Sequence, residues 1–232
     1  MLLSLNTCGS TASVALGVAG AHEIEILATA SLAARTYSAR LIPEIAAMLE
    51  SRHATLRDIE AIVVVNGPGS FTGIRVGLST AKGLAEGAGI PLIAVSRLAL
   101  LASASGLPHV LAAVDAGRGE YYVGEYQNGN NLGEVLLSGE ETVALAKQPG
   151  AGVLVCDESV AGDASASATS ACAALAICGP VYVQPPDAAK ALRFALGRFR
   201  AGKFDDVETL QANYLRRSDA EVLRSAKAGV AT

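Results

Sequence analysis

The run Ala61–Val65 consists entirely of small or β-branched apolar residues. A strand that is apolar on both faces is typical of the middle of a sheet whose two sides are covered by helices. Gly67-Pro68-Gly69-Ser70 ends the run, and Ser70 or Thr72 can cap a helix that continues to about residue 88. A buried strand followed by a tight turn and a helix predicts an α/β fold.

The segments on either side of this strand predict the rest of a first lobe. Expected strands are 2–6, 12–18, 22–32 and 91–95, and expected helices are 38–52 and 97–104. Pro43 falls inside the pattern of the first of these helices, so that helix either begins near Pro43 or kinks there. Because strands come first and a buried strand then lies between helices, we expect a mixed sheet.

A second, reduced lobe is expected from about Pro108 onward. Its expected elements are strands at 109–115, 120–127 and 132–138, an Asn-Gly hairpin turn at 128–131 and a terminal helix at 187–202. Residues 2–16 and 110–124 share one plan, in which an apolar strand ends at Asn6 or Asp115 and returns after a glycine-containing turn. This internal similarity suggests a duplicated lobe. We therefore predict two domains, 1–105 and 106–232, with part of the C-terminal tail completing the first.

Composition limits the classes of function. The 232 residues are 51% hydrophobic and 17% charged, which excludes an intrinsically disordered chain. A net charge of −4 argues against broad nucleic-acid binding. The four cysteines form no CxxC pair and are expected to be reduced thiols. No basic region precedes an apolar segment at the N-terminus and no apolar stretch is long enough to span a bilayer, so we expect a cytoplasmic protein that does not contact membranes.

The most distinctive motif is Gly67-Pro68-Gly69-Ser70-Phe71-Thr72-Gly73. Its glycines could allow backbone N–H groups to face a phosphate at the start of a helix. However, it has no lysine and matches neither the P-loop nor the dinucleotide-binding pattern. Local chemistry therefore favours a structural turn that permits close packing.

The helix expected after this turn carries small residues spaced by four, which form one stripe: Gly73, Gly77, Ala81 and Ala85. Small stripes let another helix approach closely. Apolar side chains flank the stripe and line one face of the helix expected over 38–52. They are Leu41, Ile45, Met48, Leu49, Ile74 and Leu78. These two faces either dock onto partner helices or pack only within the monomer, and the residue pattern leaves both alternatives open.

Other candidate sites are weaker. Two glycine-containing hairpins could hold a nucleotide with magnesium, but the first offers Asn6 in place of a carboxylate, and Asp115 in the second is the kind of residue that usually stabilises a turn. The three histidines are scattered and no nucleophile motif occurs. The last helix is basic, which usually marks a solvated face and less often an RNA-contacting edge.

The sequence as a whole resembles a known family. Residues 62–85, IVVVNGPGSFTGIRVGLSTAKGLA, closely resemble the bacterial TsaB (YeaZ) family. The resemblance continues in SLNT at 4–7, RLIP at 40–43, LAAVDA at 111–116, GEYY at 119–122 and YLR at 214–216. It covers about the first 125 residues and the C-terminal tail.

The resemblance implies the two-lobed fold shared by actin, Hsp70 and sugar kinases. It implies a non-catalytic scaffold that binds, stabilises and activates TsaD, the enzyme that forms threonylcarbamoyladenosine beside the anticodon of tRNA. TsaE would join the larger complex, the chain would form a homodimer when alone, and tRNA would be contacted only indirectly. Docking would use the two helices of the first lobe. The expected interface residues are Leu41, Ile45, Met48, Leu49, Gly73, Ile74, Gly77, Leu78 and Ala81.

Departures from the family pattern fall in the cleft. Arg97 and Leu101 occupy the places where TsaD has metal-binding histidines, and neither side chain can ligate a metal. Asn6, Tyr37 and Ala212 replace the usual Asp, His and Pro. We therefore expect no catalytic residue, metal or cofactor. The alternatives are an ATP-dependent phosphotransferase of the same fold and, less favoured, a peptidase.

Overall fold

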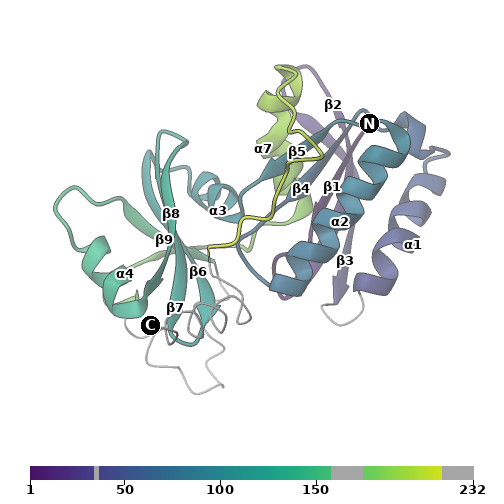
Figure 1. Cartoon of the computed structure of the whole chain (residues 1–232). Helices are drawn as coiled ribbons and strands as arrows, with labels where there is room; N and C mark the ends of the chain where they lie inside the picture. The colour runs from purple at the N-terminus through teal and green to yellow at the C-terminus, as the bar shows by residue number, and fades with distance from the viewer. Residues whose placement is uncertain (34–36, 158–174, 216–232) are drawn as a thin grey trace.

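The computed structural model describes residues 1–33, 37–157 and 175–215, which form two lobes, each built on one sheet (Figure 1). In the first sheet the strands lie in the order β3-β2-β1-β4-β5. Their bounds are β1 Leu2–Asn6, β2 Thr11–Ala19, β3 Ile24–Ala33, β4 Ala61–Val65 and β5 Leu92–Val95. β2 is antiparallel to β1 and β3, whereas β4 is parallel to β1 and β5. The predicted mixed sheet with β4 in its buried interior is confirmed, since all five residues of β4 are buried.

The second sheet repeats the same plan in the order β10-β9-β6-β7-β8. Its strands are β6 His109–Gly117, β7 Glu120–Gln127, β8 Asn130–Ser138, β9 Val153–Asp157 and β10 Val181–Val183. β6, β7, β8, β9 and β10 pair as β1, β2, β3, β4 and β5 do. The predicted duplication and the two-lobed fold of the actin, Hsp70 and sugar-kinase type are therefore confirmed. The second lobe is not reduced in its sheet, although α4 (Gly139–Ala146) is shorter than its counterpart α1 (Tyr37–Glu50).

Helices cover both faces of the first sheet. α1 and α2 (Phe71–Ala88) lie side by side on one face, and α7 (Ala188–Arg200) covers the other (Figure 1). The core beneath α1 and α2 includes Leu3, Leu5 and Leu16, and the core beneath α7 includes Leu2 and Val63. Pro43 neither begins α1 nor ends it, because the helix starts at Tyr37 and continues to Glu50.

Two helices cross between the lobes. α3 (Arg97–Ser105) follows β5 of the first sheet but packs on β6, β7 and β9 of the second. α7 follows β10 of the second sheet but packs on β1, β2 and β4 of the first. The two helices also contact each other. The lobes are therefore joined by packed helices.

The loop before α2 is held tightly against the end of β1. Ser70 accepts a hydrogen bond from the backbone N–H of Gly73 and so caps α2, as the sequence predicts. The backbone N–H of Ser70 donates to the carbonyl of Cys8. A Cβ at Gly69 would lie 2.2 Å from that carbonyl oxygen, so only glycine fits here. The motif thus forms the close-packed structural turn predicted for Gly67, Pro68, Gly69 and Ser70.

The C-terminal segment lies beside α2 (Figure 1). Asp205 accepts hydrogen bonds from Arg198 and from the backbone N–H of Ala94, which anchors the segment at β5. Asn213 donates its backbone N–H to Asn66. The Ala/Ser-rich stretch 161–176 lies almost wholly outside the described residues. Among the described helices, none is long and apolar enough to cross a membrane.

Candidate functional site

The small stripe of α2 faces the first sheet. Thr7 lies directly beneath it, and its hydroxyl donates a 2.6 Å hydrogen bond to the carbonyl of Gly73. A Cβ at Gly77 would lie 2.1 Å from the Thr7 hydroxyl oxygen. Glycine at this position therefore lets α2 pack against the end of β1 at a distance that no other residue permits.

The residues predicted to form the interface are buried in the chain's own core: Leu41, Ile45, Met48, Leu49, Gly73, Ile74, Gly77, Leu78 and Ala81. Among the side chains of this set, Leu78 is the most exposed, and only 8% of its surface is accessible to solvent. The prediction is therefore wrong about the face of the two helices, because the apolar positions of α1 and the small stripe of α2 are needed to cover the sheet. A partner can contact α1 and α2 only from the outside.

The outer face of α1 and α2 carries a second set of small and apolar residues. On α1 the exposed residues include Ala39, Ile42 and Ala46, and Ile42 is 50% exposed. On α2 they include Gly83 and Gly87, spaced by four. A Cβ at either glycine would meet no heavy atom within 4 Å. A glycine inside a helix costs about 0.5–1 kcal/mol relative to alanine. Nothing within the described chain requires that cost at Gly83.

The C-terminal segment borders this outer face. Arg75 lies over the ring of Phe71 and donates from Nε to the Tyr214 hydroxyl at 2.9 Å. The rings of Phe71 and Tyr214 are 5.2 Å apart. Lys82 donates to the carbonyls of Glu208 and Leu210. The tail, as far as the structure describes it, is thus attached along one side of α2 and leaves Gly83 uncovered.

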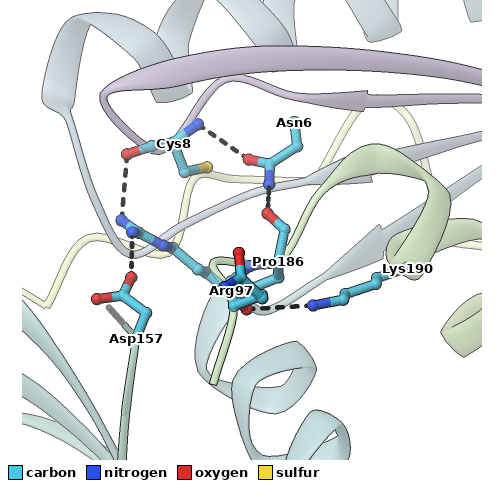
Figure 2. Close-up of polar contacts among 7 residues, drawn as sticks. Asn6, Cys8, Arg97, Asp157, Pro186 and Lys190 are labelled. Carbon is cyan, nitrogen blue, oxygen red and sulfur yellow. Dashed lines mark hydrogen bonds and ion pairs between the residues drawn. The ribbon is translucent and has the colours of Figure 1, made fainter. Parts of the chain in front are cut away.

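A buried ion pair joins the two lobes (Figure 2). Arg97, the first residue of α3, donates from Nη2 to the carboxylate of Asp157 at the end of β9, at 2.7 Å. The side chains are 9% and 0% exposed. Arg97 also donates to the carbonyl of Cys8, at 3.4 Å. Leu101, the other position at which the resemblance implies a lost metal ligand, is fully buried in the core of the second lobe.

The other residues considered for a ligand site, Asn6 and Asp115, form hydrogen bonds within the chain. Asn6 donates to the carbonyl of Pro186 and accepts from the backbone N–H of Cys8, so it links β1 to the start of α7 (Figure 2). Asp115 accepts from the backbone N–H of Gly117 and stabilises its own turn. Burial raises the pKa of the Cys8 thiol to about 12, which keeps it protonated and unreactive at neutral pH. In the described residues no three His, Cys, Asp or Glu side chains gather as a metal site.

Sequence reasoning missed a second polar cluster, centred on Glu134 of β8. Its carboxylate accepts hydrogen bonds from Ser96, Tyr126 and Asn213, which belong to the start of α3, to β7 and to the C-terminal segment. Burial, together with the Glu134 acceptor, raises the pKa of the Tyr126 phenol well above its ordinary value. The cluster therefore fixes the second lobe and the tail against the first lobe.

Comparisons with known proteins agree with this architecture. Residues 25–199 match the family model described as TsaD, tRNA N6-adenosine threonylcarbamoyltransferase. The chain is 39% identical over 153 residues to the tRNA threonylcarbamoyladenosine biosynthesis protein TsaB of Escherichia coli, covering 63% of this chain and 62% of that protein. It is 36% identical over 141 residues to TsaB of Bacillus subtilis, covering 59% and 60%. These alignments thus span about three fifths of the relatives' length.

Two solved structures from Pseudomonas aeruginosa are similar over nearly the whole chain. One, described as an uncharacterized protein with similarity to peptidase YeaZ, has a TM-score of 0.72 and 28% identity, covering 93% of this chain and 99% of that one. The other, YeaZ, has a TM-score of 0.69 and 26% identity, covering 92% and 99%. The two repeated sheets and the helices that cross between them define a two-lobed α/β protein of the actin, Hsp70 and sugar-kinase class. Within that class, the chain belongs to the TsaD-related family, in its TsaB (YeaZ) group.

Replacement by alanine should have different effects on stability at the buried Gly77 and at the exposed Gly83 of α2. Gly77→Ala should lower the free energy of unfolding by about 1–3 kcal/mol, because the new Cβ overlaps Thr7. Gly83→Ala should leave it unchanged or raise it by about 0.5–1 kcal/mol, because the site is open and alanine favours helix. Urea unfolding followed by circular dichroism measures both. Equal stability of the two variants would contradict the assignment of faces.

The Arg97–Asp157 pair should behave as a coupled unit. Arg97→Met should cost about 3–5 kcal/mol of stability, because Asp157 stays buried without its cation. Adding Asp157→Leu to that variant should recover part of the loss. A double-mutant cycle in urea gives the coupling, and additive single effects would show that the two side chains do not stabilise each other.

Proposed function

We propose that this chain is a non-catalytic partner subunit in tRNA threonylcarbamoyladenosine biosynthesis, and that it stabilises and activates a TsaD protein by docking the outer face of α1 and α2 onto it. The relatives are named as tRNA threonylcarbamoyladenosine biosynthesis proteins, which supports a role for this chain in that pathway. The family match to TsaD supports a pairing between two chains of one fold. The buried ion pair between Arg97 and Asp157 supports a role in which this chain catalyses no reaction itself.

The observation that carries the docking proposal is the pair Gly83 and Gly87. Both lie on the exposed side of α2 and neither is required by any neighbour within the described chain. Glycine on a helix surface lets another helix approach closely, as small stripes do between packed helices. Ile42 and Ala46 are exposed on α1, which lies beside α2 on the same face of the sheet (Figure 1), and they add apolar surface. Two helices from each partner can bury the roughly 1,600 Å² of a standard interface.

The resemblance implies further associations, and the first of them would use the same face. Without TsaD, two copies of this chain would pair through it as a homodimer. TsaE would join the larger complex, tRNA would be contacted through the complex, and the subunit would act in the cytoplasm. None of these associations needs a metal or cofactor held by this chain.

Replacing Gly83 with leucine tests the docking face. Gly83→Leu should weaken binding to the TsaD protein of the same organism at least tenfold, because the side chain separates the helices. The matched control is Gly197→Leu on α7, which is also an exposed helix glycine with no neighbour within 4 Å but lies on the far side of the sheet. Calorimetry with purified proteins measures both affinities. Unchanged binding by Gly83→Leu, or equal loss in both variants, would contradict the proposed face.

A further inference from the structure

A second candidate site lies on the side of the first sheet that α7 covers, away from α1 and α2. α7 and the C-terminal half of α3 border a cavity of about 530 Å³ that is partly open to solvent. This volume falls within the roughly 300–1,000 Å³ typical of small-molecule sites. The wall contributed by α7 consists of Lys190, Arg193 and Phe194. Residues three and four apart share one face of a helix, so these side chains face the cavity together.

The charged part of the cavity is positive. Arg193 is exposed and makes no hydrogen bond or ion pair within the part of the chain that the structure describes. Lys190 donates one N–H from Nζ to the carbonyl of Gln184 at 3.1 Å, which leaves two donors for a ligand (Figure 2). None of the residues that line the cavity is acidic. Asp187, one turn earlier, accepts from the backbone N–H of Lys190 and caps the helix. In a chain of net charge −4, this cavity presents two cations together.

Apart from Ser103 and Gln184, the rest of the cavity lining is apolar. Phe194 is 37% exposed and has no aromatic partner among the described residues. Leu100 and Ala104 of α3 and Val183 of β10 complete the apolar lining. A ligand that satisfies both parts carries an anionic group for Lys190 and Arg193 and a flat apolar group that stacks on Phe194. A nucleotide has this chemistry, since its phosphate binds cations and its base stacks on aromatic rings.

We propose that the cavity between α3 and α7 binds a nucleotide, with its phosphate on Lys190 and Arg193 and its base against Phe194. The nucleotide is either free or part of a single-stranded RNA, and the two sources share the same contacts. The lining of this site does not include Arg97 or Asp157. The site is also separate from the proposed docking face, so its failure would leave the docking proposal standing.

Calorimetric titration of the full-length protein tests the site, since the chain has no Trp whose fluorescence could report binding. The probes are ADP, a short single-stranded oligoadenylate and inorganic phosphate. ADP or the oligonucleotide should bind, and phosphate should bind far more weakly. Tighter binding of ADP identifies a free nucleotide, whereas tighter, strongly salt-dependent binding of the oligonucleotide identifies RNA. If neither nucleotide probe binds, or if phosphate binds as well as ADP, the proposal is overturned.

Matched variants locate the binding. Arg193→Glu should weaken it about tenfold or more, because a charge-assisted hydrogen bond is lost and repulsion is added. Its control is Lys203→Glu, the same change of charge at an exposed residue outside the cavity. Phe194→Ala should weaken it about fivefold or more, because the stacking surface is lost. Its control is Phe204→Ala, since Phe204 is 41% exposed and lies outside the cavity. Circular dichroism confirms that each variant is folded. Equal losses in variants and controls would overturn the proposal.

Discussion

The contact between Thr7 and the backbone of α2 determines which side of α2 faces the sheet and which side faces outward. The Thr7 hydroxyl bonds to the Gly73 carbonyl, and Gly77 leaves room for the threonine side chain. This contact fixes the rotation of α2 about its axis, so that the stripe from Gly73 to Ala85 is buried. Once that side is committed to the sheet, Gly83 must point outward. The surface that we propose for docking therefore follows from how α2 packs on the sheet.

The two lobes are held together by a buried pair of charges. Arg97 at the start of α3 and Asp157 at the end of β9 form an ion pair between the lobes. Asn6, at the end of β1, donates to the carbonyl of Pro186 just before α7. A buried ion pair loses much of its Coulomb energy to desolvation, so its main effect is to specify one arrangement of the lobes. The crossing of α3 and α7 reinforces that arrangement through packing.

Much of the fold could be predicted from local patterns. The β-branched run of β4, the serine caps of α2 and α3, and the similarity of residues 2–16 to 110–124 each report a local preference that the packing keeps. The elements α4, β9 and β10 were not predicted. Two of them had usable signals, a capping box from Ser138 to Glu141 and the apolar run in Val153–Asp157. β10 has only three residues and pairs along one edge, which leaves almost no periodicity to detect.

The candidate site shows why pattern alone cannot distinguish a core from an interface. Both α1 and α2 carry small or apolar residues on the buried face and on the exposed face, and either face matches the pattern of a helix that docks. The choice depends on long-range contacts: Thr7 lies 66 residues before Gly73 in the chain, and Asp157 lies 60 residues after Arg97. Neither pairing leaves a periodic signal. Gly83 supports the docking proposal only because the structure shows that none of its described neighbours requires a glycine there.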